Sequence, residues 1–438
     1  MLTNEDNETL TRVGPGALMG NLLRRYWQPA LLSSELPAAD CPPVRVRLLG
    51  EDLIAFRNTE GGVGLVANAC PHRGASLFFG RNEESGLRCV YHGWKFDVEG
   101  TCVDMPSEPA ESNFKSKVRV VAYPTRESGG VVWTYMGPAD KQPGFREIVS
   151  PSLPQENWRA SKIYGMCNWV QGLEGNIDAS HTSFLHRNLS FEKLVPDETD
   201  KPGYPSLNMT FLIWAFDPAP DLEVHETWYG FRYTGLRDTP GGYRHARVTD
   251  YIFPAITYIP AAPVGGNDCI IMVPIDDTHH WRYHVSTKVP VKLRDGMSQQ
   301  GPAGNRRPGG IMARPWLPEN DYLIDREKQR TQSYTGIDGG AIPQDQAVTE
   351  SMGDIYDRTH EHLGTTDKAI IRMRRMLISA ARDLAKGIEP PVLDARRSYD
   401  SFRPSEKILA KTEDWRSLGT ADDPVMQNLE PVYASTPA

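Results

Sequence analysis

Two short cysteine–histidine segments decide most of the fold. The first reads Cys-Pro-His-Arg-Gly at residues 70–74, and the second reads Cys-Val-Tyr-His-Gly-Trp at residues 89–94. Each segment offers one thiolate and one imidazole, and this combination is typical of transition-metal sites. The spacing therefore predicts one metal site with mixed ligands. The predicted ligands are Cys70, His72, Cys89 and His92.

Two cofactors fit a site of this composition. In a Rieske [2Fe–2S] cluster, two histidines replace two cysteines on one iron, which raises the potential. Zinc also binds sets of two cysteines and two histidines. The flanks favour the cluster, because Gly74 and Gly93 follow the two halves closely, as expected of tight loops whose backbone N–H groups face cluster sulfurs. We therefore expect a Rieske centre.

The two segments resemble the Rieske domain of the Rieske non-haem iron oxygenases. The resemblance rests on residues 70–74 and on the pattern Cys-x-Tyr-His-Gly-Trp-x-Phe at residues 89–96. The Rieske proteins of quinol-oxidising respiratory complexes usually carry an extra disulfide cysteine in each loop, whereas residues 73–75 and 90–91 contain none. This difference favours a soluble, low-potential electron-transfer centre.

The bulk properties narrow the class of protein. A chain of 438 residues suits two domains better than one core. A net charge of −8 gives no electrostatic footprint for nucleic acid or an anionic membrane. No window approaches the roughly 20 apolar residues that span a bilayer, and the acidic start at residues 1–6 is unlike a signal peptide. Six cysteines do not suggest a disulfide framework, so we expect a cytoplasmic protein that binds neither nucleic acid nor membranes.

The pattern of short strands and helices predicts an α+β protein with four parts. Residues 1–43 form an N-terminal segment that we expect to pack on the catalytic domain. Residues 44–155 contain short strands separated by Gly and Pro turns, which indicates a small antiparallel β domain with the cluster loops at one end. Residues 156–390 form the catalytic domain, and residues 391–438 form a tail that wraps the surface or a neighbour.

Hydrophobic periodicity predicts the elements of both domains. In the first part of the chain we expect a helix at 16–26 and strands at 44–49, 53–56, 64–67, 95–97, 117–123 and 131–135. In the catalytic domain we expect strands at 159–164, 207–213, 223–232, 243–253, 269–274 and 281–288. Helices are expected at 166–183, 344–358 and 366–386, the last ending at Gly387. Residues 187–205 and 299–310 are expected to be loops.

A second pair of histidines lies near the end of the helix expected at 166–183. His181 and His186 are five residues apart, which is about 140° around an ideal helix. A regular helix cannot easily bring both to one ion, so we expect it to end or distort between them, near residues 182–183. Asp178, three residues before His181, shares its face and would fix the tautomer of that imidazole.

Two imidazoles need a carboxylate to complete the three-ligand face that Fe(II) uses in oxygen chemistry. The alternative is a pair of helix-end histidines whose nitrogens bind backbone groups. A Rieske motif in the same chain favours iron, because the two sites would combine a one-electron carrier with an oxygen-activating metal.

The spacing of Asp178, His181 and His186 resembles the active-site motif of the oxygenase family. The family's carboxylate ligand comes from a late helix that carries Asp and, five residues on, Glu. This matches Asp345 and Glu350 here, so the resemblance implies Asp345 as the third ligand. The alternatives close by in the sequence are Asp354 and Asp357.

The resemblance covers nearly the whole chain, and residues 1–8, 24–29 and 357–367 look like the phthalate dioxygenase branch. It implies a terminal oxygenase with a Rieske domain and a helix-grip (START-like) catalytic domain, in which an antiparallel sheet is combined with helices. It implies a [2Fe–2S] cluster, mononuclear Fe(II), O2, and electrons from NADH through a separate flavin and [2Fe–2S] reductase. The implied reaction is hydroxylation of an aromatic carboxylate, a phthalate or substituted benzoate, by cis-dihydroxylation.

The resemblance also implies a trimer or two stacked trimers, with electron transfer between neighbouring subunits. Asp178 would then bridge His181 and His92 of the partner subunit. One alternative activity is a Rieske monooxygenase or O-demethylase acting on a methoxy- or substituted benzoate. Another is a non-catalytic electron carrier or redox sensor, which would leave the second domain unexplained.

A substrate carboxylate needs a local cation, and arginine is the natural partner because it can bind both oxygens. Arg244 and Arg247 lie on opposite faces of the strand expected at 243–253, so at most one points inward. We choose Arg244 as the substrate-binding residue. The alternative is that Arg244 faces solvent.

Overall fold

The computed structural model describes most of the chain and confirms the α+β class with antiparallel sheets. Among the residues it describes, no helix is long and apolar enough to cross a membrane. The described residues are 1–109, 111–149, 153–189, 202–203, 205, 207–260, 266–288, 310–391 and 404–419. Most of the loops expected at 187–205 and 299–310 lie outside them.

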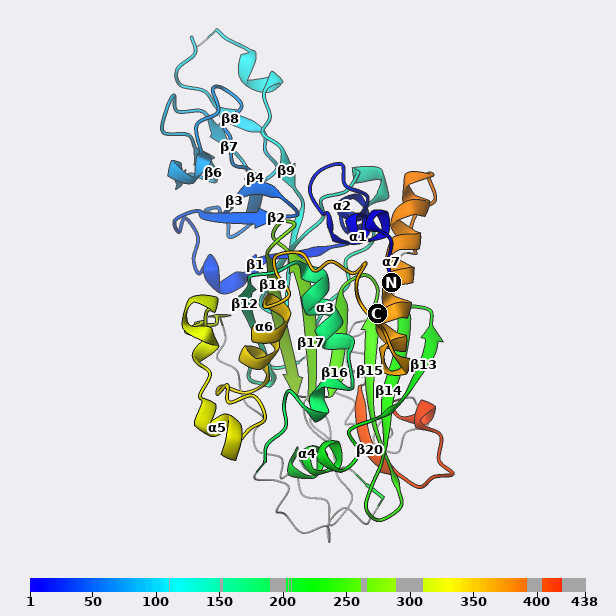
Figure 1. Ribbon diagram of the computed structural model, residues 1–438. Helices are drawn as coiled ribbons and strands as arrows, with labels where there is room; N and C mark the ends of the chain where they lie inside the picture. The colour runs from blue at the N-terminus through cyan, green and yellow to red at the C-terminus, as the bar shows by residue number, and fades with distance from the viewer. Residues whose placement is uncertain are drawn as a thin grey trace.

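The smaller domain, blue and cyan in Figure 1, contains three antiparallel sheets. Their strand orders are β1-β11-β10, β2-β3-β4-β9 and β5-β6-β7-β8. The strands are β1 (Gln28–Leu32), β2 (Val44–Leu48), β3 (Glu51–Arg57), β4 (Val63–Ala67), β5 (Arg81–Glu83), β6 (Gly86–Arg88), β7 (Lys95–Phe96), β8 (Cys102–Asp104), β9 (Ala122–Tyr123), β10 (Thr125–Ser128) and β11 (Val131–Thr134). Of the strand expected at 117–123, only β9 forms.

The larger domain is built on one nine-stranded sheet in the order β13-β14-β15-β16-β17-β18-β12-β19, with β20 paired to β15. All its pairings are antiparallel except that of β12 with β19. The strands are β12 (Trp158–Gly165), β13 (Asp221–Thr227), β14 (Gly230–Asp238), β15 (Arg244–Ile252), β16 (Ile256–Pro260), β17 (Gly266–Pro274), β18 (His280–Lys288), β19 (Gly310–Ile311) and β20 (Ser405–Leu409).

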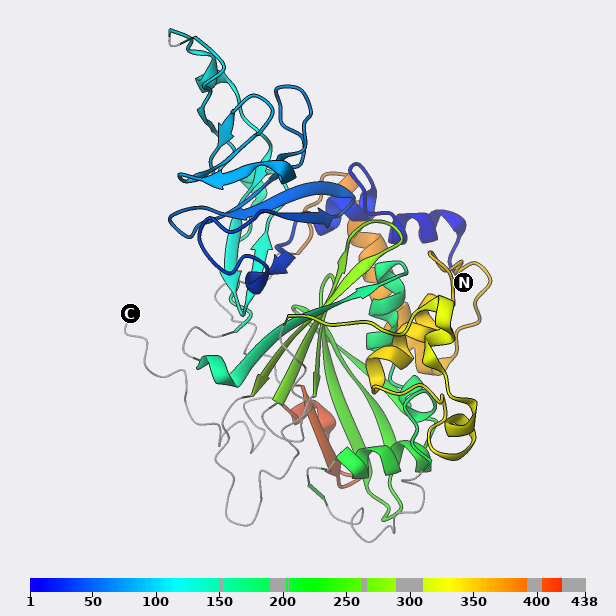
Figure 2. The ribbon, with the colours of Figure 1, turned by 90° about the vertical axis from the view of Figure 1, so that its left-hand side faces the viewer.

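Helices cover one face of this sheet, as Figure 2 shows. The longest, α7, buries residues such as Ile370, Met373 and Leu377 at helical spacing and is followed by Gly387 at a φ of 85°. Helix α3 packs against β17, β18, α6 and α7. The helices are α1 (Asn4–Thr11), α2 (Leu18–Leu23), α3 (Trp169–Ile177), α4 (Leu207–Phe216), α5 (Arg326–Thr331), α6 (Ala341–Glu350) and α7 (Lys368–Ala385).

Several expected elements are corrected by the structure. The strand expected at 207–213 is wrong, because this segment forms helix α4; a continuous apolar run does not distinguish a buried strand from a helix. The single strand expected at 223–232 is a hairpin, β13 and β14, that turns before Gly230. Helix α6 ends at Glu350 rather than near 358, and Gly353 follows at a φ of 89°. Strand β16 was not expected.

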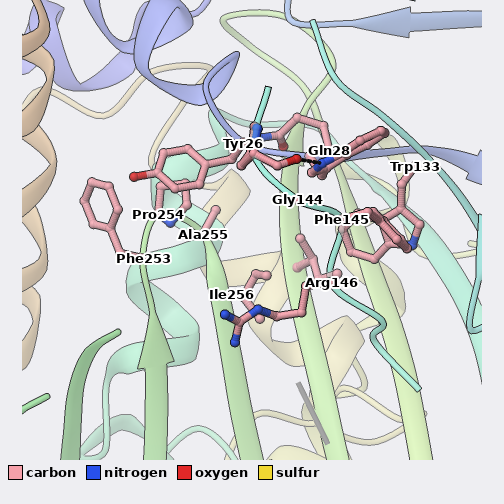
Figure 3. A pocket seen from close by; sticks show the side chains of 13 residues that line it. Tyr26, Gln28, Trp133, Gly144, Phe145, Arg146, Phe253, Pro254, Ala255 and Ile256 are labelled. Atoms are coloured by element: carbon pink, nitrogen blue, oxygen red, sulfur yellow. Dashed lines mark hydrogen bonds between the residues drawn. The ribbon is translucent and has the colours of Figure 1, made fainter. Parts of the chain in front are cut away.

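The N-terminal segment joins the two domains. Helices α1 and α2 pack against α7, and the Asn7 amide donates to the carbonyl oxygen of Tyr356 at 3.1 Å. The indole N–H of Trp27 donates to the carbonyl of Pro143 at 3.0 Å. A cavity of about 50 Å³ lies at this junction, between aromatic side chains and the end of β16, with Arg146 among its lining residues (Figure 3). The cluster domain is therefore fixed to the catalytic sheet through packed side chains.

Candidate metal centres and active site

The two cysteine–histidine loops close in the same way. In each loop the cysteine N–H donates to the carbonyl five residues further on, at 2.8 Å for both Cys70 and Cys89. Gly74 and Gly93 donate back to the cysteine carbonyls, at 2.8 and 2.9 Å. Both glycines have a positive φ, 74° and 80°, which side chains rarely adopt. The two loops thus form a matched pair, each presenting one thiol and one imidazole.

The four predicted side chains lie close together at the ends of the two loops. The Cys70 and Cys89 side chains are each 2% exposed. The imidazole rings of His72 and His92 lie 4.3 Å apart between centroids, and the His72 ring stacks on Trp94. Nδ1 of His72 is buried with no hydrogen-bond partner among the described residues. This set of donors fits a Rieske cluster.

A single zinc ion fits less well. Four donors at 2.0–2.3 Å around one zinc lie about 3.5 Å from one another. Among the described residues, no three of these cysteine and histidine donors fall within 4.8 Å of one another, as the ligands of one ion must. Two irons separate the donors further, so the geometry favours the cluster over zinc.

The mononuclear site begins where α3 ends. The helix stops at Ile177, and Asp178 follows in an extended conformation. His181 starts a short 3₁₀ turn that runs to Ser183. The break was expected near residues 182–183, but it lies before His181, and the turn then brings His186 back towards it.

Three side chains converge at this point from α6 and the turn after α3. Nε2 of His181 and Nε2 of His186 lie 3.2 Å apart. Oδ1 of Asp345 lies 3.1 Å from Nε2 of His186 and 3.8 Å from Nε2 of His181. These three form the one group of potential ligands within 4.8 Å of one another among the described residues. Asp354 and Asp357 are exposed and are not part of the group, so the geometry favours Asp345.

Neighbouring side chains bond His186 and Asp345, and Asp178 lies beside His181. Oε1 of Gln344 accepts from Nδ1 of His186 at 2.7 Å, which leaves Nε2 as a ligand atom. Arg282 donates to Oδ2 of Asp345 at 3.1 Å, so the other oxygen faces the histidines. Oδ2 of Asp178 lies 3.6 Å from Nδ1 of His181. Neither Gln344 nor Arg282 is predicted from the sequence; the signal that could have found Gln344 is its position directly before the ligand Asp345.

The charges of the site are consistent with a bound cation. Burial raises the pKa of Asp345, but His186 and Arg282 more than offset this effect and lower it. Burial likewise opposes ionisation of Asp178, yet His181 and Ser180 lower its pKa to about 2. Both carboxylates are therefore ionised at neutral pH, beside imidazoles that point at one position. This donor set fits Fe(II), for which two histidines and one carboxylate leave coordination positions open.

A cavity of about 370 Å³ opens onto the three converging side chains. This volume lies in the usual range for small-molecule sites. Its walls combine apolar and aromatic side chains with arginines. The lining includes Phe211 and Trp214 of α4, Tyr233 and Arg237 of β14, Arg247 of β15, Ile259 of β16, Ile270 of β17, Arg282 of β18, and Arg187.

The structure corrects the choice of substrate arginine. Arg244 is absent from the cavity lining, its side chain is 42% exposed, and it lies 3.9 Å from Asp238 on the surface. Arg247 lines the cavity instead. Alternation along strand β15 does place the two side chains on opposite faces, but it is Arg247 and not Arg244 that faces the cavity.

Comparison with known proteins places the whole chain. A Rieske [2Fe–2S] domain model matches residues 26–124, and a model described as LigXa C-terminal domain like matches residues 134–435. The chain is 39% identical to the 3-chlorobenzoate-3,4-dioxygenase oxygenase subunit of Comamonas testosteroni, covering 95% of this chain and 98% of that one. It is also 39% identical to the phthalate 4,5-dioxygenase oxygenase subunit of Pseudomonas putida, covering 95% and 94%.

A solved structure shows the same fold at lower identity. The terminal oxygenase of carbazole 1,9a-dioxygenase from Nocardioides aromaticivorans IC177 matches with a TM-score of 0.53 and 19% identity, covering 86% of this chain and 97% of that chain. The matched models span both domains, and the predicted ligands fall within them. The chain therefore belongs to the Rieske non-haem iron oxygenases, as an oxygenase subunit with a [2Fe–2S] cluster domain and a mononuclear iron domain.

Proposed function

We propose that this oxygenase hydroxylates an aromatic carboxylate, a phthalate or substituted benzoate, by cis-dihydroxylation of the ring. The observation that carries the proposal is one cavity that joins the three-ligand site to aromatic walls and a cationic side chain. Fe(II) held by His181, His186 and Asp345 would supply O2 activation, with electrons from the cluster. The chain's own residues bind and orient the ring beside that site.

Arg247 is the best candidate to bind the carboxylate. Arg237 donates to the carbonyl of Ala179 at 2.7 Å and so holds the turn that carries His181. Arg282 is bonded to Asp345. These two cavity arginines therefore serve the metal site, whereas the guanidinium carbon of Arg187 lies 6.0 Å from the Tyr334 ring. Arg247 is half-buried in the cavity wall, where its guanidinium can donate to a carboxylate.

The electron path is proposed to cross between subunits of a trimer or of stacked trimers. Figures 1 and 2 place β6–β8, which flank the cluster loops, at one end of the chain, and α4 with the end of α3 at the other. Val90 and Tyr91, beside the cluster ligands, are 57% and 54% exposed. Large apolar side chains exposed at a redox centre favour contact with another protein surface. A flavin and [2Fe–2S] reductase is the proposed source of electrons.

Asp178 is proposed to connect the two centres. Oδ1 of Asp178 accepts from the backbone and hydroxyl of Ser180, at 2.7 and 2.8 Å, while Oδ2 lies beside His181. A carboxylate can accept from two imidazole N–H groups at once, so it could join His181 to His92 of the partner subunit. We expect Asp178→Asn to slow cluster-to-iron electron transfer by about 10- to 100-fold. An unchanged transfer rate, with both metals bound, would rule out this role.

Product analysis tests the reaction itself. The reduced, iron-loaded protein would be supplied with O2 and with phthalates, substituted benzoates or methoxybenzoates. The products would be identified by mass spectrometry. A cis-diol that gains two oxygen atoms is the expected product. A phenol with formaldehyde would indicate an O-demethylase, and one added oxygen a monooxygenase. No product from any aromatic acid would contradict the proposed substrate class.

A further inference from the structure

The C-terminal segment returns to the catalytic sheet as β20. It pairs with the first half of β15, whereas β16 pairs with the second half. In this register Glu406 stands directly opposite Arg247. Figure 1 shows β20, in orange-red, near the lower ends of β14 and β15. A residue far along the chain from the metal ligands is thereby placed beside the cavity wall.

The Glu406 side chain contacts three other side chains. Its Oε1 accepts from the Thr210 hydroxyl at 2.5 Å and from Nε2 of His245 at 2.8 Å. Its Oε2 lies 3.5 Å from Nε of Arg247. Glu406 is 7% exposed, and burial raises its pKa, but His245 and Arg247 more than offset this effect. Glu406 is therefore a buried carboxylate that is ionised at neutral pH.

These contacts fix two parts of the cavity wall. Thr210 belongs to α4, which contributes Phe211 and Trp214 to the lining. The guanidinium carbon of Arg247 lies 5.8 Å from the Trp214 ring, and its Nη2 donates to the carbonyl of Pro260 at 3.0 Å. Nε and Nη2 of Arg247 are thus engaged, and Nη1 has no hydrogen-bond partner within the described parts of the chain. Nη1 is therefore the part of the guanidinium that can donate to a ligand.

We propose that Glu406 positions Arg247 for the substrate carboxylate, so that the C-terminal strand determines the preference of the cavity for acids. A long arginine side chain samples many rotamers unless its partners fix it. Glu406 lies against the Nε edge of Arg247, so the Nη1 side is held in one orientation. It acts through Arg247 and through α4. The inference rests on the proposed function, because it assumes an acidic substrate.

The test compares an acid with its uncharged analogue. The substrate is the acid turned over best among phthalate, 3-chlorobenzoate and methoxybenzoate, and its methyl ester is the analogue. In Glu406→Gln we expect the KM of the acid to rise about tenfold or more, since one partner of a buried ion pair is lost. We expect the KM of the ester to change less than about twofold. Thr210→Val should shift the acid KM in the same direction by a smaller factor.

A matched control removes the carboxylate of an ion pair elsewhere in the chain. Glu35 pairs with Lys162 at 2.6 Å and does not line the cavity, so Glu35→Gln should change neither KM. An unchanged acid KM in Glu406→Gln, or equal changes for acid and ester, would overturn the inference. If that variant does not fold, an unchanged ratio of acid to ester KM in Thr210→Val would overturn it. Failure of the wild-type protein to oxidise any acid would instead refute the proposed function.

Discussion

The two metal centres of this chain are built in opposite ways. The cluster loops lie within 23 residues of each other, from Cys70 to His92, and close through local backbone hydrogen bonds. The mononuclear site takes its ligands from the turn after α3 and from Asp345, more than 150 residues later. The first site depends on short-range geometry. The second depends on how far-apart elements pack, so the two should respond differently to mutation.

The largest contrast is expected on removing one ligand from either site. Asp345→Ala should leave the cluster absorbance intact but lower mononuclear iron binding and product formation by about a hundredfold or more. Cys70→Ser should abolish the cluster absorbance and turnover, yet leave iron binding at the other site. Metal analysis and visible spectra check both variants. Loss of both metals from either variant would contradict the independence of the two sites.

The next contrast concerns a residue that supports a ligand. Gln344→Leu removes the acceptor for Nδ1 of His186, and we expect iron affinity to fall by about 10- to 100-fold. Gln346→Leu is a matched control on the same helix, because its amide bonds Tyr164 and Trp316 instead. Equilibrium iron titration distinguishes the two. Equal affinities in both variants would show that Gln344 does not hold the ligand.

A buried ion cluster beneath α3 should matter more for stability than for chemistry. Glu174 binds Arg358 at 2.9 Å and Arg374 at 2.6 Å, and it is 9% exposed. Glu174→Gln leaves the arginines short of a partner, so we expect a loss of about 3 kcal/mol of unfolding free energy. Glu226→Gln, which breaks an exposed pair with Arg372, should cost below about 1 kcal/mol. If denaturant titrations showed similar losses of unfolding free energy in Glu174→Gln and Glu226→Gln, the buried ion cluster would not have the larger effect on stability.

The same cluster predicts a pH dependence. Burial raises the pKa of Glu174, but the two arginines more than offset this effect and hold it below its usual value. The stabilisation is therefore present above the unfolded-state pKa of about 4.3 and is lost as the pH falls through the folded-state value. Below about pH 4, the Tm of the wild-type protein should fall more steeply than that of Glu174→Gln. If the Tm of the two proteins fell in parallel with pH, ionisation of Glu174 would not contribute to stability.

The smallest contrast lies inside the matched cluster loops. A Cβ at Gly93 would stand 2.7 Å from the Pro106 ring, whereas at Gly74 nothing lies within 4 Å. Both positions have a positive φ, so each Ala variant should cost about 1–2 kcal/mol from backbone strain. The Gly93→Ala protein should retain less [2Fe–2S] cluster than the Gly74→Ala protein, because its Cβ also clashes with the Pro106 ring. Iron and sulfide content after purification measures the difference, and equal losses would show that only the backbone matters.

This difference in construction also explains what could be predicted from sequence. The cluster ligands were identified from residue types and spacing, since their geometry is local. His181, His186 and Asp345 were found through a motif, and the structure brings them together. Gln344, Arg282 and Glu406 were missed, because their contacts arise only when α6, β18 and β20 meet the turn and the sheet.

The remaining errors have physical causes. The segment that forms helix α4 is predicted as a strand because its apolar residues show no clear period. The sequence does not distinguish Arg247 from Arg244, because alternation along a strand separates two faces without indicating which one is inside. Both errors concern which residues line the cavity. The residues that determine substrate specificity are therefore harder to predict from this sequence than the metal ligands.

The central claim is that the two centres act together as one oxygenase. The most direct test mixes the fully reduced protein with O2, with and without an aromatic acid, and follows the cluster absorbance in a stopped-flow instrument. We predict substrate-stimulated oxidation of the cluster, matched by product, in the wild-type protein, and a cluster that stays reduced for much longer in Asp345→Ala. Equal oxidation rates in the two proteins, with no dependence on substrate, would contradict the account.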